Sequence, residues 1–238
     1  MVKETQITYL YNSGFSLELG DKLIIFDYYE DPANKISKIL QDKKSVYVFA
    51  SHSHFDHFNP DIALWQLQTT RYFLSYDIKN ARGTKSLPKE KTIYLNEYDS
   101  YSDQNIKVIS FSSTDEGISF LVEIDGWRIF HAGDFNWWHW KEDTAENIQL
   151  AKNGFMKQMK KLDGLKADIA FFPVDRRLEE FCDIGAREFC QRTNINYLIT
   201  MHNAEKAPWK APSDFPCPDK LISTWTPENP GDGIKIIR

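Results

Sequence analysis

The stretch His52-Ser53-His54-Phe55-Asp56-His57 holds three of the six histidines of the chain in one short window. It directly follows Val46-Tyr47-Val48-Phe49-Ala50, a continuous apolar run that predicts a buried strand. Two histidines at positions i and i+2 of a turn can converge on one cation, and Asp56 with His57 can reach a second. Imidazole nitrogens and carboxylate oxygens suit zinc, manganese or iron. A solvated histidine-rich loop is the alternative, but these residue types at fixed offsets form a demanding pattern.

Length and composition describe an ordinary globular protein. The chain has 238 residues, of which 42% are hydrophobic and 26% are charged, enough for a continuous core. The formal net charge of -5 argues against a broad electrostatic footprint for nucleic acid. The three cysteines, Cys182, Cys190 and Cys217, have no CxxC spacing and predict a reducing compartment without a disulfide framework. Because no signal-like or membrane-length apolar stretch is present, we expect a cytoplasmic protein with no membrane partner.

Short apolar runs alternate with helical patterns along the chain. The expected strands are 15–19, 23–26, 46–50, 72–74, 92–95, 106–111, 118–124, 127–130, 168–174 and 195–201. The expected helices begin at Asp31-Pro32 and Asn59-Pro60, cover 144–162, and lie around 184–192. Six of the ten prolines follow Ala204, which predicts an irregular tail over 204–238. We expect one domain over residues 1–238, with this tail at its end.

Four acid or imidazole residues each come just after a predicted strand: His52, Asp134, Asp175 and His202. In layered α/β folds, the carboxyl ends of the strands gather along one edge, where functional loops collect. Residues that are distant in sequence are therefore expected to meet there.

The pattern His52-x-His54-x-Asp56-His57 after a hydrophobic strand resembles the signature of the metallo-β-lactamase fold superfamily. Gly133-Asp134 resembles the bridging aspartate of that family, and His202 resembles its final histidine. The run Ile129-Phe130-His131-Ala132-Gly133-Asp134 is most similar to the branch with ascorbate-6-phosphate lactonase and many uncharacterised bacterial proteins. The resemblance implies an α+β fold, a four-layer αββα sandwich of two mixed β-sheets packed face to face with helices on both outer faces.

The resemblance also implies two divalent metal ions, for which zinc is favoured and manganese or iron are alternatives. The ligands implied by position are His52 and His54 for the first metal, Asp56, His57 and His202 for the second, and Asp134 for both. A hydroxide held by the metals would attack an electrophilic carbonyl or phosphorus centre. Asp56 and Asp134 are therefore the expected catalytic residues.

The turn before Asp134 departs from the family pattern. Relatives usually offer a third histidine to the first metal there, but residues 111–117 contain none. Aligning Gly117 with the turn glycine of the family places Thr114 at the ligand position, next to Asp115. We expect Asp115 to act as a substitute oxygen ligand, and the alternatives are a water molecule or an emptier first site. An oxygen-rich shell would shift the preference from zinc towards manganese or iron.

Aromatic and basic residues near the strand ends are candidates for substrate binding. Trp137, Trp138 and His139 follow Asp134 and could wall an apolar pocket, although clustered aromatic residues are as often part of a core. Arg176 follows a predicted strand end and could clamp a carboxylate or phosphate, with a surface ion pair as an equal alternative.

The expected function is a metal-dependent hydrolase that acts on a small-molecule ester, lactone, thioester or phosphoester. The expected partner is that small-molecule substrate; no nucleic acid is expected, and a homo-oligomer is compatible with the sequence. Three alternatives stay open. They are a nuclease of the same superfamily, a diiron-type oxidoreductase, and a metal-binding scaffold without catalysis.

Overall fold

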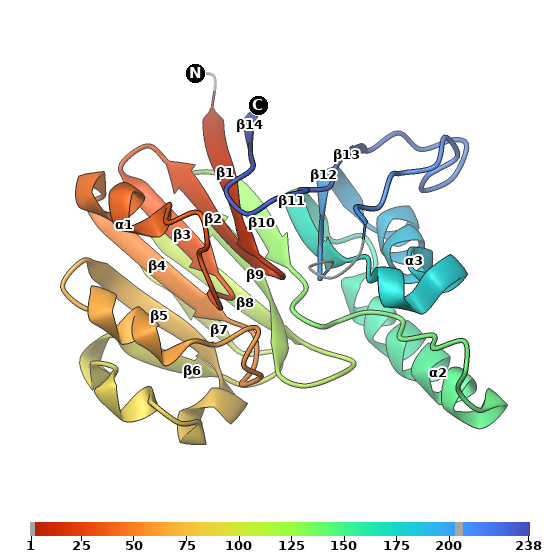
Figure 1. Cartoon of the computed structure of the whole chain (residues 1–238), viewed down its shortest axis with the longest axis horizontal. Coiled ribbons are helices and arrows are strands. Elements are labelled where there is room, and N and C mark those ends of the chain that lie inside the picture. The colour runs from red at the N-terminus through yellow and green to blue at the C-terminus, as the bar shows by residue number, and fades with distance from the viewer. Residues whose placement is uncertain (1–2, 203–206) are drawn as a thin grey trace. The chain divides into compact units, whose positions relative to one another are not determined.

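The computed structural model describes residues 3–202 and 207–238, so the first residues of the predicted tail lie outside the described residues. The chain divides into two compact units, of which the first comprises Met1–Asn96 with Pro227–Arg238 and the second Glu97–Thr226. Each unit is built on one seven-stranded mixed β-sheet (Figure 1). The predicted fold class, α+β with two mixed β-sheets and helices, is therefore confirmed.

The sheet of the first unit has the strand order β14-β1-β2-β3-β4-β5-β6. Its strands are β1 (Glu4–Tyr11), β2 (Gly14–Leu19), β3 (Lys22–Phe26), β4 (Ser45–Ala50), β5 (Thr69–Ser75), β6 (Thr92–Leu95) and β14 (Gly233–Ile237). The strands from β1 to β3 are antiparallel neighbours, whereas those from β3 to β6 run parallel. The carboxyl ends of β3 and β4 therefore lie side by side, which matters for the site below.

The last strand, β14, differs from the irregular tail that the sequence predicts. It pairs antiparallel with β1, as Figure 1 shows in blue beside red. Ile236 is buried opposite Thr5, and Lys235 lies opposite Gln6. The alternation of apolar and polar residues in this short run is a strand signal, but the prolines that precede it dominate the composition of the tail.

Short helices cover one face of the first sheet. They are α1 (Ile36–Ile39), η1 (Leu40–Asp42), η2 (Pro60–Trp65), η3 (Tyr76–Asn80), η4 (Thr84–Ser86) and η5 (Lys89–Lys91), where η marks a 3-10 helix. Ile36, Leu40 and Ile62 pack in one apolar core with Val46 and Val48 of β4. The first helix begins at Ile36, later than the sequence predicts, and the Asp31 carboxylate accepts a hydrogen bond from the amide of Ile36 at 2.7 Å.

The sheet of the second unit has the order β13-β12-β11-β10-β9-β8-β7. Its strands are β7 (Ser100–Ser102), β8 (Ile106–Ser112), β9 (Ile118–Ile124), β10 (Trp127–His131), β11 (Lys166–Pro173), β12 (Asn194–Met201) and β13 (Ser223–Trp225). Strands β10 to β13 are parallel, and β7 to β10 are antiparallel. The short β13 is a second strand in the region that the sequence predicts to be irregular.

Two longer helices, α2 (Ala145–Leu162) and α3 (Ile184–Arg192), accompany this second sheet, together with η6 (Arg176–Phe181). Thr144 caps α2 by accepting a hydrogen bond from the amide of Asn147 at 3.2 Å. Phe155 of α2 stacks on Phe135 at 5.0 Å between ring centroids, and Phe189 of α3 stacks on Phe130 of β10 at 5.2 Å. Both helices agree with the predicted ranges, because their apolar positions recur at helical spacing. Among the described residues, no helix is both long enough and apolar enough to span a bilayer.

Glu179 interrupts η6 with φ 53° and ψ -122°, a conformation that favours glycine. Such backbone strain typically costs about 1–3 kcal/mol. We expect Glu179→Gly to raise the free energy of unfolding by about 1 kcal/mol, the relief of strain being partly offset by the greater freedom of glycine in the unfolded chain. Urea denaturation measures this change. Glu180→Gly is the matched control, because Glu180 also pairs with Lys141 and its replacement should destabilise; equal effects of the two variants would contradict the assignment of strain.

The three cysteines are free thiols and differ in burial. Burial raises the pKa of the Cys190 thiol well above its usual range, and burial also raises the pKa of Cys182 although Arg176 opposes the shift. Since the thiolate is the reactive form, a raised pKa leaves less of it at any given pH. We expect iodoacetamide at pH 8 to alkylate the part-exposed Cys217 first, as measured by peptide mass spectrometry. Labelling of Cys190 in the folded protein at a similar rate would contradict this ranking.

Candidate metal centre

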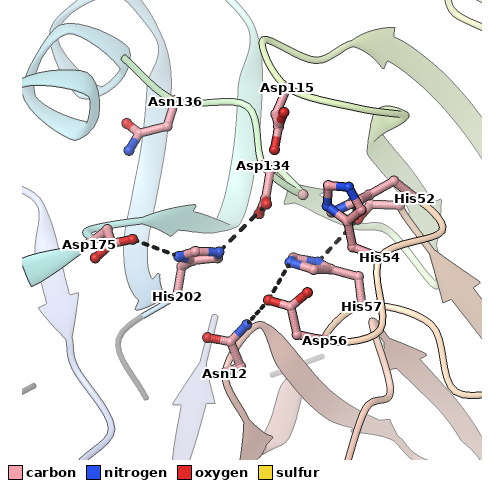
Figure 2. Close-up of polar contacts among 12 residues, drawn as sticks. Asn12, His52, His54, Asp56, His57, Asp115, Asp134, Asn136, Asp175 and His202 are labelled. Atoms are coloured by element: carbon pink, nitrogen blue, oxygen red, sulfur yellow. Dashed lines mark hydrogen bonds and ion pairs between the residues drawn. The ribbon is translucent and has the colours of Figure 1, made fainter. Parts of the chain in front are cut away.

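The histidine window follows β4 in the first unit and folds into a tight turn (Figure 2). The amides of His57 and Phe58 both donate to the carbonyl oxygen of His54 at 3.0 Å. His52 Nε2 lies 3.0 Å from His54 Nδ1, so the i and i+2 imidazoles meet as the spacing predicts. His52 and His57 are buried, whereas Phe55 between them is 74% exposed. The turn therefore buries His52 and His57, whereas Asp56 is half-buried and His54 is exposed like Phe55.

Asp27 anchors this turn, although the sequence analysis did not place it in the site. It follows β3, is buried, and has a positive φ of 42°. Its carboxylate accepts hydrogen bonds from the amide and the hydroxyl of Ser51, each at 2.7 Å, and lies 2.7 Å from His57 Nδ1. The strand-end rule that selected His52 would also have found Asp27, because β3 and β4 are parallel neighbours.

The other nitrogen of His57 faces Asp56. His57 Nε2 lies 3.6 Å from Asp56 Oδ2, which is too long for a hydrogen bond. Asn12, in the turn between β1 and β2, donates to the same Asp56 oxygen at 2.9 Å. The amide of Asn12 thereby holds the Asp56 carboxylate in place.

In the second unit, three site residues follow adjacent parallel strands, as predicted. Asp134 comes after β10, Asp175 after β11 and His202 after β12, and all three are buried. His202 Nδ1 lies 3.0 Å from Asp175 Oδ2, and His202 Nε2 lies 3.5 Å from Asp134 Oδ2 (Figure 2). One imidazole thus lies between two carboxylates, with a hydrogen bond to only one of them.

The two units repeat one arrangement: a buried aspartate holds Nδ1 of a histidine, and Nε2 faces a second carboxylate. A carboxylate on the far nitrogen is the usual partner of a metal-binding histidine, since it fixes the tautomer and the ring orientation. Two ligand atoms bound to one zinc at about 2.1 Å in tetrahedral geometry lie about 3.4 Å apart. The separations of 3.6 Å at His57 and 3.5 Å at His202 fit that geometry better than a direct hydrogen bond. The residues present therefore fit a divalent cation.

Electrostatics supports this orientation at His202. Burial by itself would raise the pKa of Asp175, but hydrogen bonds from His202 and Arg177 outweigh it and lower the pKa to about 2. Arg177 Nε donates to Asp175 Oδ2 at 2.9 Å and Nη2 donates to the same oxygen. An ionised Asp175 accepts the proton of Nδ1, which leaves the lone pair of Nε2 for a metal ion.

The turn that lacks the third histidine is held by Thr114. Its hydroxyl donates to the carbonyl oxygen of Asn136 at 2.7 Å and accepts from the amide of Asn136 at 2.9 Å. Thr114 therefore fastens the loop between β8 and β9 to the segment that follows Asp134. Asp115, the predicted substitute ligand, is exposed at the next position.

The three predicted substrate residues after Asp134 lie in different surroundings. Trp137 stacks on Phe155 of α2 at 5.8 Å between centroids, which is a packing contact. Trp138 donates from Nε1 to the carbonyl oxygen of Asp134 at 3.0 Å and meets the ring of His202 edge-on at 5.5 Å. His139 stacks on Phe181 at 3.9 Å. Of the three, Trp138 is the one that contacts a candidate ligand.

The two neighbouring arginines after β11 also separate. Arg177 binds Asp175, as described above, and its guanidinium lies over the ring of Trp140 at 5.7 Å. Arg176, the predicted substrate residue, instead donates to Cys182 Sγ at 3.6 Å and lines an open pocket. The sequence has two arginines after this strand. The conformation of η6 places Arg177, rather than Arg176, in contact with Asp175.

A family model described as Beta-lactamase superfamily domain matches residues 6–152. The chain therefore belongs to the metallo-β-lactamase superfamily, which confirms the resemblance inferred from the histidine window. No curated protein matches the sequence. The more specific likeness to the ascorbate-6-phosphate lactonase branch stays a prediction.

Solved structures agree on the fold. A metallo hydrolase, Igni18, from the archaeon Ignicoccus hospitalis is 17% identical with a TM-score of 0.67, and the match covers 98% of each chain. Human tRNase Z, short form, is 13% identical with a TM-score of 0.57, covering 97% of this chain and 98% of that one. CmlA, a diiron β-hydroxylase from Streptomyces venezuelae, is 10% identical with a TM-score of 0.59, covering 98% of this chain and 54% of that one. Since these relatives differ in chemistry, their similarity concerns the fold alone.

Proposed function

We propose that the chain is a metal-dependent hydrolase that cleaves a small-molecule ester, lactone, thioester or phosphoester. The observation that carries this proposal is the repeated arrangement in which Asp27 orients His57 towards Asp56, and Asp175 orients His202 towards Asp134. The proposed ligands of two divalent ions are His52, His54, Asp56, His57, Asp115, Asp134 and His202. Asp56 and Asp134 are the proposed catalytic residues.

Bound divalent ions supply Lewis acidity and lower the pKa of a coordinated water towards neutrality. The residues of the chain have defined parts in this chemistry. Asp27 and Asp175 hold the Nδ1 protons of two imidazoles, and Asn12 holds the Asp56 carboxylate by the 2.9 Å hydrogen bond. Trp138 lies against one edge of His202, so we propose that it restricts water and contacts the apolar part of the substrate.

We propose zinc as the metal, since four imidazoles dominate the ligand set. Asp115 is proposed to take the place of the missing histidine. One of the two metal ions would then have more oxygen ligands. The metal content of wild type and Asp115→Ala, measured together, tests this assignment: the variant should lose one of two ions. Unchanged occupancy in Asp115→Ala would reject Asp115 as a ligand while leaving the hydrolase proposal intact.

Turnover of four substrate classes tests the proposed function. The probes are p-nitrophenyl acetate, γ-butyrolactone, acetyl thiocholine and bis(p-nitrophenyl) phosphate. We expect hydrolysis of at least one probe, its loss after chelation by EDTA, and its recovery with added zinc or manganese. Fully metal-loaded protein that cleaves none of the four would favour a metal-binding scaffold.

A diiron oxidoreductase is the second candidate. It is favoured by the oxygen donor of Asp115, next to the position of the usual histidine, and a diiron β-hydroxylase shares the fold. Iron as the retained metal, together with oxygen consumption in the presence of a reductant, would select this candidate over the hydrolase. A nuclease is less consistent with the net charge of -5.

We propose that the protein acts in the cytoplasm on a freely diffusing small molecule. The three free thiols support a reducing compartment.

A further inference from the structure

The second unit contains an open pocket of about 440 Å³ beside η6. Its walls come from residues 176–183, which follow β11, and residues 208–212, which follow β12. A volume of this size falls within the roughly 300–1,000 Å³ of small-molecule sites. The buried ring of Trp209 forms a rigid part of the wall, fixed edge-on against Phe215 at 5.0 Å between centroids.

Each acidic residue of this pocket forms an ion pair with a cation from outside the pocket lining. Lys141 Nζ lies 2.9 Å from Glu179 and 3.3 Å from Glu180. Arg187 Nε lies 3.1 Å from Asp183. These two cations offset at most two of the three negative charges, and Arg187 also lies 3.3 Å from Asp214.

The basic residues of the pocket have no such partners among the described residues. Arg176 makes one hydrogen bond there, from Nη1 to Cys182 Sγ at 3.6 Å, and sulfur is a weak acceptor. Lys210 forms no ion pair within the described part of the chain, and both side chains are exposed. Arg176 and Lys210 are therefore the two cationic side chains of the lining that are available to a ligand.

We infer that this pocket binds the carboxylate or phosphate group of a small organic molecule, with Arg176 and Lys210 as its cationic contacts. A guanidinium matches the geometry of both anions, and an ammonium adds a second positive charge. The strained backbone of Glu179 lies in the same wall, and such strain concentrates at binding sites. The inference goes beyond the proposed hydrolysis, since it concerns binding and holds whether or not the protein turns over a substrate.

Isothermal titration calorimetry on the metal-loaded full chain tests the inference. Glucose 6-phosphate and gluconate supply the two anions, and glucose is the uncharged control. We expect at least one anion to bind and glucose not to bind. Arg176→Gln and Lys210→Gln should each weaken binding about tenfold, the effect of one lost charge-assisted contact. Lys161→Gln, which removes an exposed lysine of α2 outside the pocket, should leave the affinity unchanged.

A bound metal ion could also attract these anions, and His54→Ala separates the two sites. Binding in the pocket should survive in His54→Ala, because His54 belongs to the first unit and does not line the pocket. Three results would overturn the inference: no binding of either anion in the millimolar range, equal binding of glucose, or binding lost in His54→Ala and unchanged in Arg176→Gln.

Discussion

Asp134→Ala is expected to abolish hydrolysis by removing the proposed ligand of both metal ions. Loss of a residue that only orients a metal ligand typically costs about 10–100-fold in metal affinity or activity. Loss of a shared ligand should exceed that range, so we expect kcat/KM to fall below detection. Steady-state kinetics with the best of the four probe substrates, and metal analysis of the same samples, measure the effect.

The fold of this variant should be intact. Asp134 and Asp175 place two carboxylates around His202, and without a metal ion such like charges disfavour the folded state. Metal-free Asp134→Ala should therefore unfold at the same denaturant concentration as metal-free wild type, or at a higher one. Asp219→Ala, at an exposed position, is the matched control and should keep full activity. Wild-type turnover by Asp134→Ala would contradict the proposed catalytic role of Asp134.

Asp27→Asn is expected to weaken metal binding about 10–100-fold although Asp27 is not a proposed ligand. The amide keeps the shape of the carboxylate, but its nitrogen cannot accept the proton of His57 Nδ1. His57 then favours the other tautomer, whose Nε2 carries a proton in place of the lone pair for the metal. Competition with a chromogenic chelator measures the zinc affinity directly, without any assay of turnover.

Asp27→Ala adds a cost in stability to this loss. Without the carboxylate, the buried Ser51 amide and the His57 ring lose an acceptor, whereas the Ser51 hydroxyl still has His52 Nδ1 at 3.0 Å. At about 1–3 kcal/mol for each unsatisfied group, the variant should lose at least about 2 kcal/mol of unfolding free energy. Asp21→Asn, on the exposed hairpin between β2 and β3, is the control and should change neither quantity. Wild-type zinc affinity in Asp27→Asn would contradict the role assigned to Asp27.

The local patterns of the sequence predicted most strands and the place of most site residues. Runs such as 118–124 and 195–201 can be predicted as strands from their local sequence, because they are apolar and bounded by turn signals. The strand-end rule correctly placed Asp134, Asp175 and His202 together in the second unit, because β10, β11 and β12 are adjacent and parallel.

The missed residues depend on contacts between distant segments. Asp27 is a single acidic residue after a strand, and it becomes an anchor only because parallel pairing of β3 with β4 brings Ser51 and His57 to it. Arg176 and Arg177 are neighbours of the same type, and the geometry of η6 decides which one reaches Asp175. The strand-end rule selects Asp27 as a candidate, but its contacts with Ser51 and His57, like the choice between the two arginines, depend on the tertiary structure.

The central claim is that the imidazole and carboxylate groups of this chain hold metal ions. The most direct test is inductively coupled plasma mass spectrometry of the wild-type protein, incubated with zinc and freed of excess metal by gel filtration. We expect about two zinc ions per chain in the wild type, and a clear loss of zinc in Asp134→Ala. Wild-type protein that retains no stoichiometric metal after this treatment would contradict it.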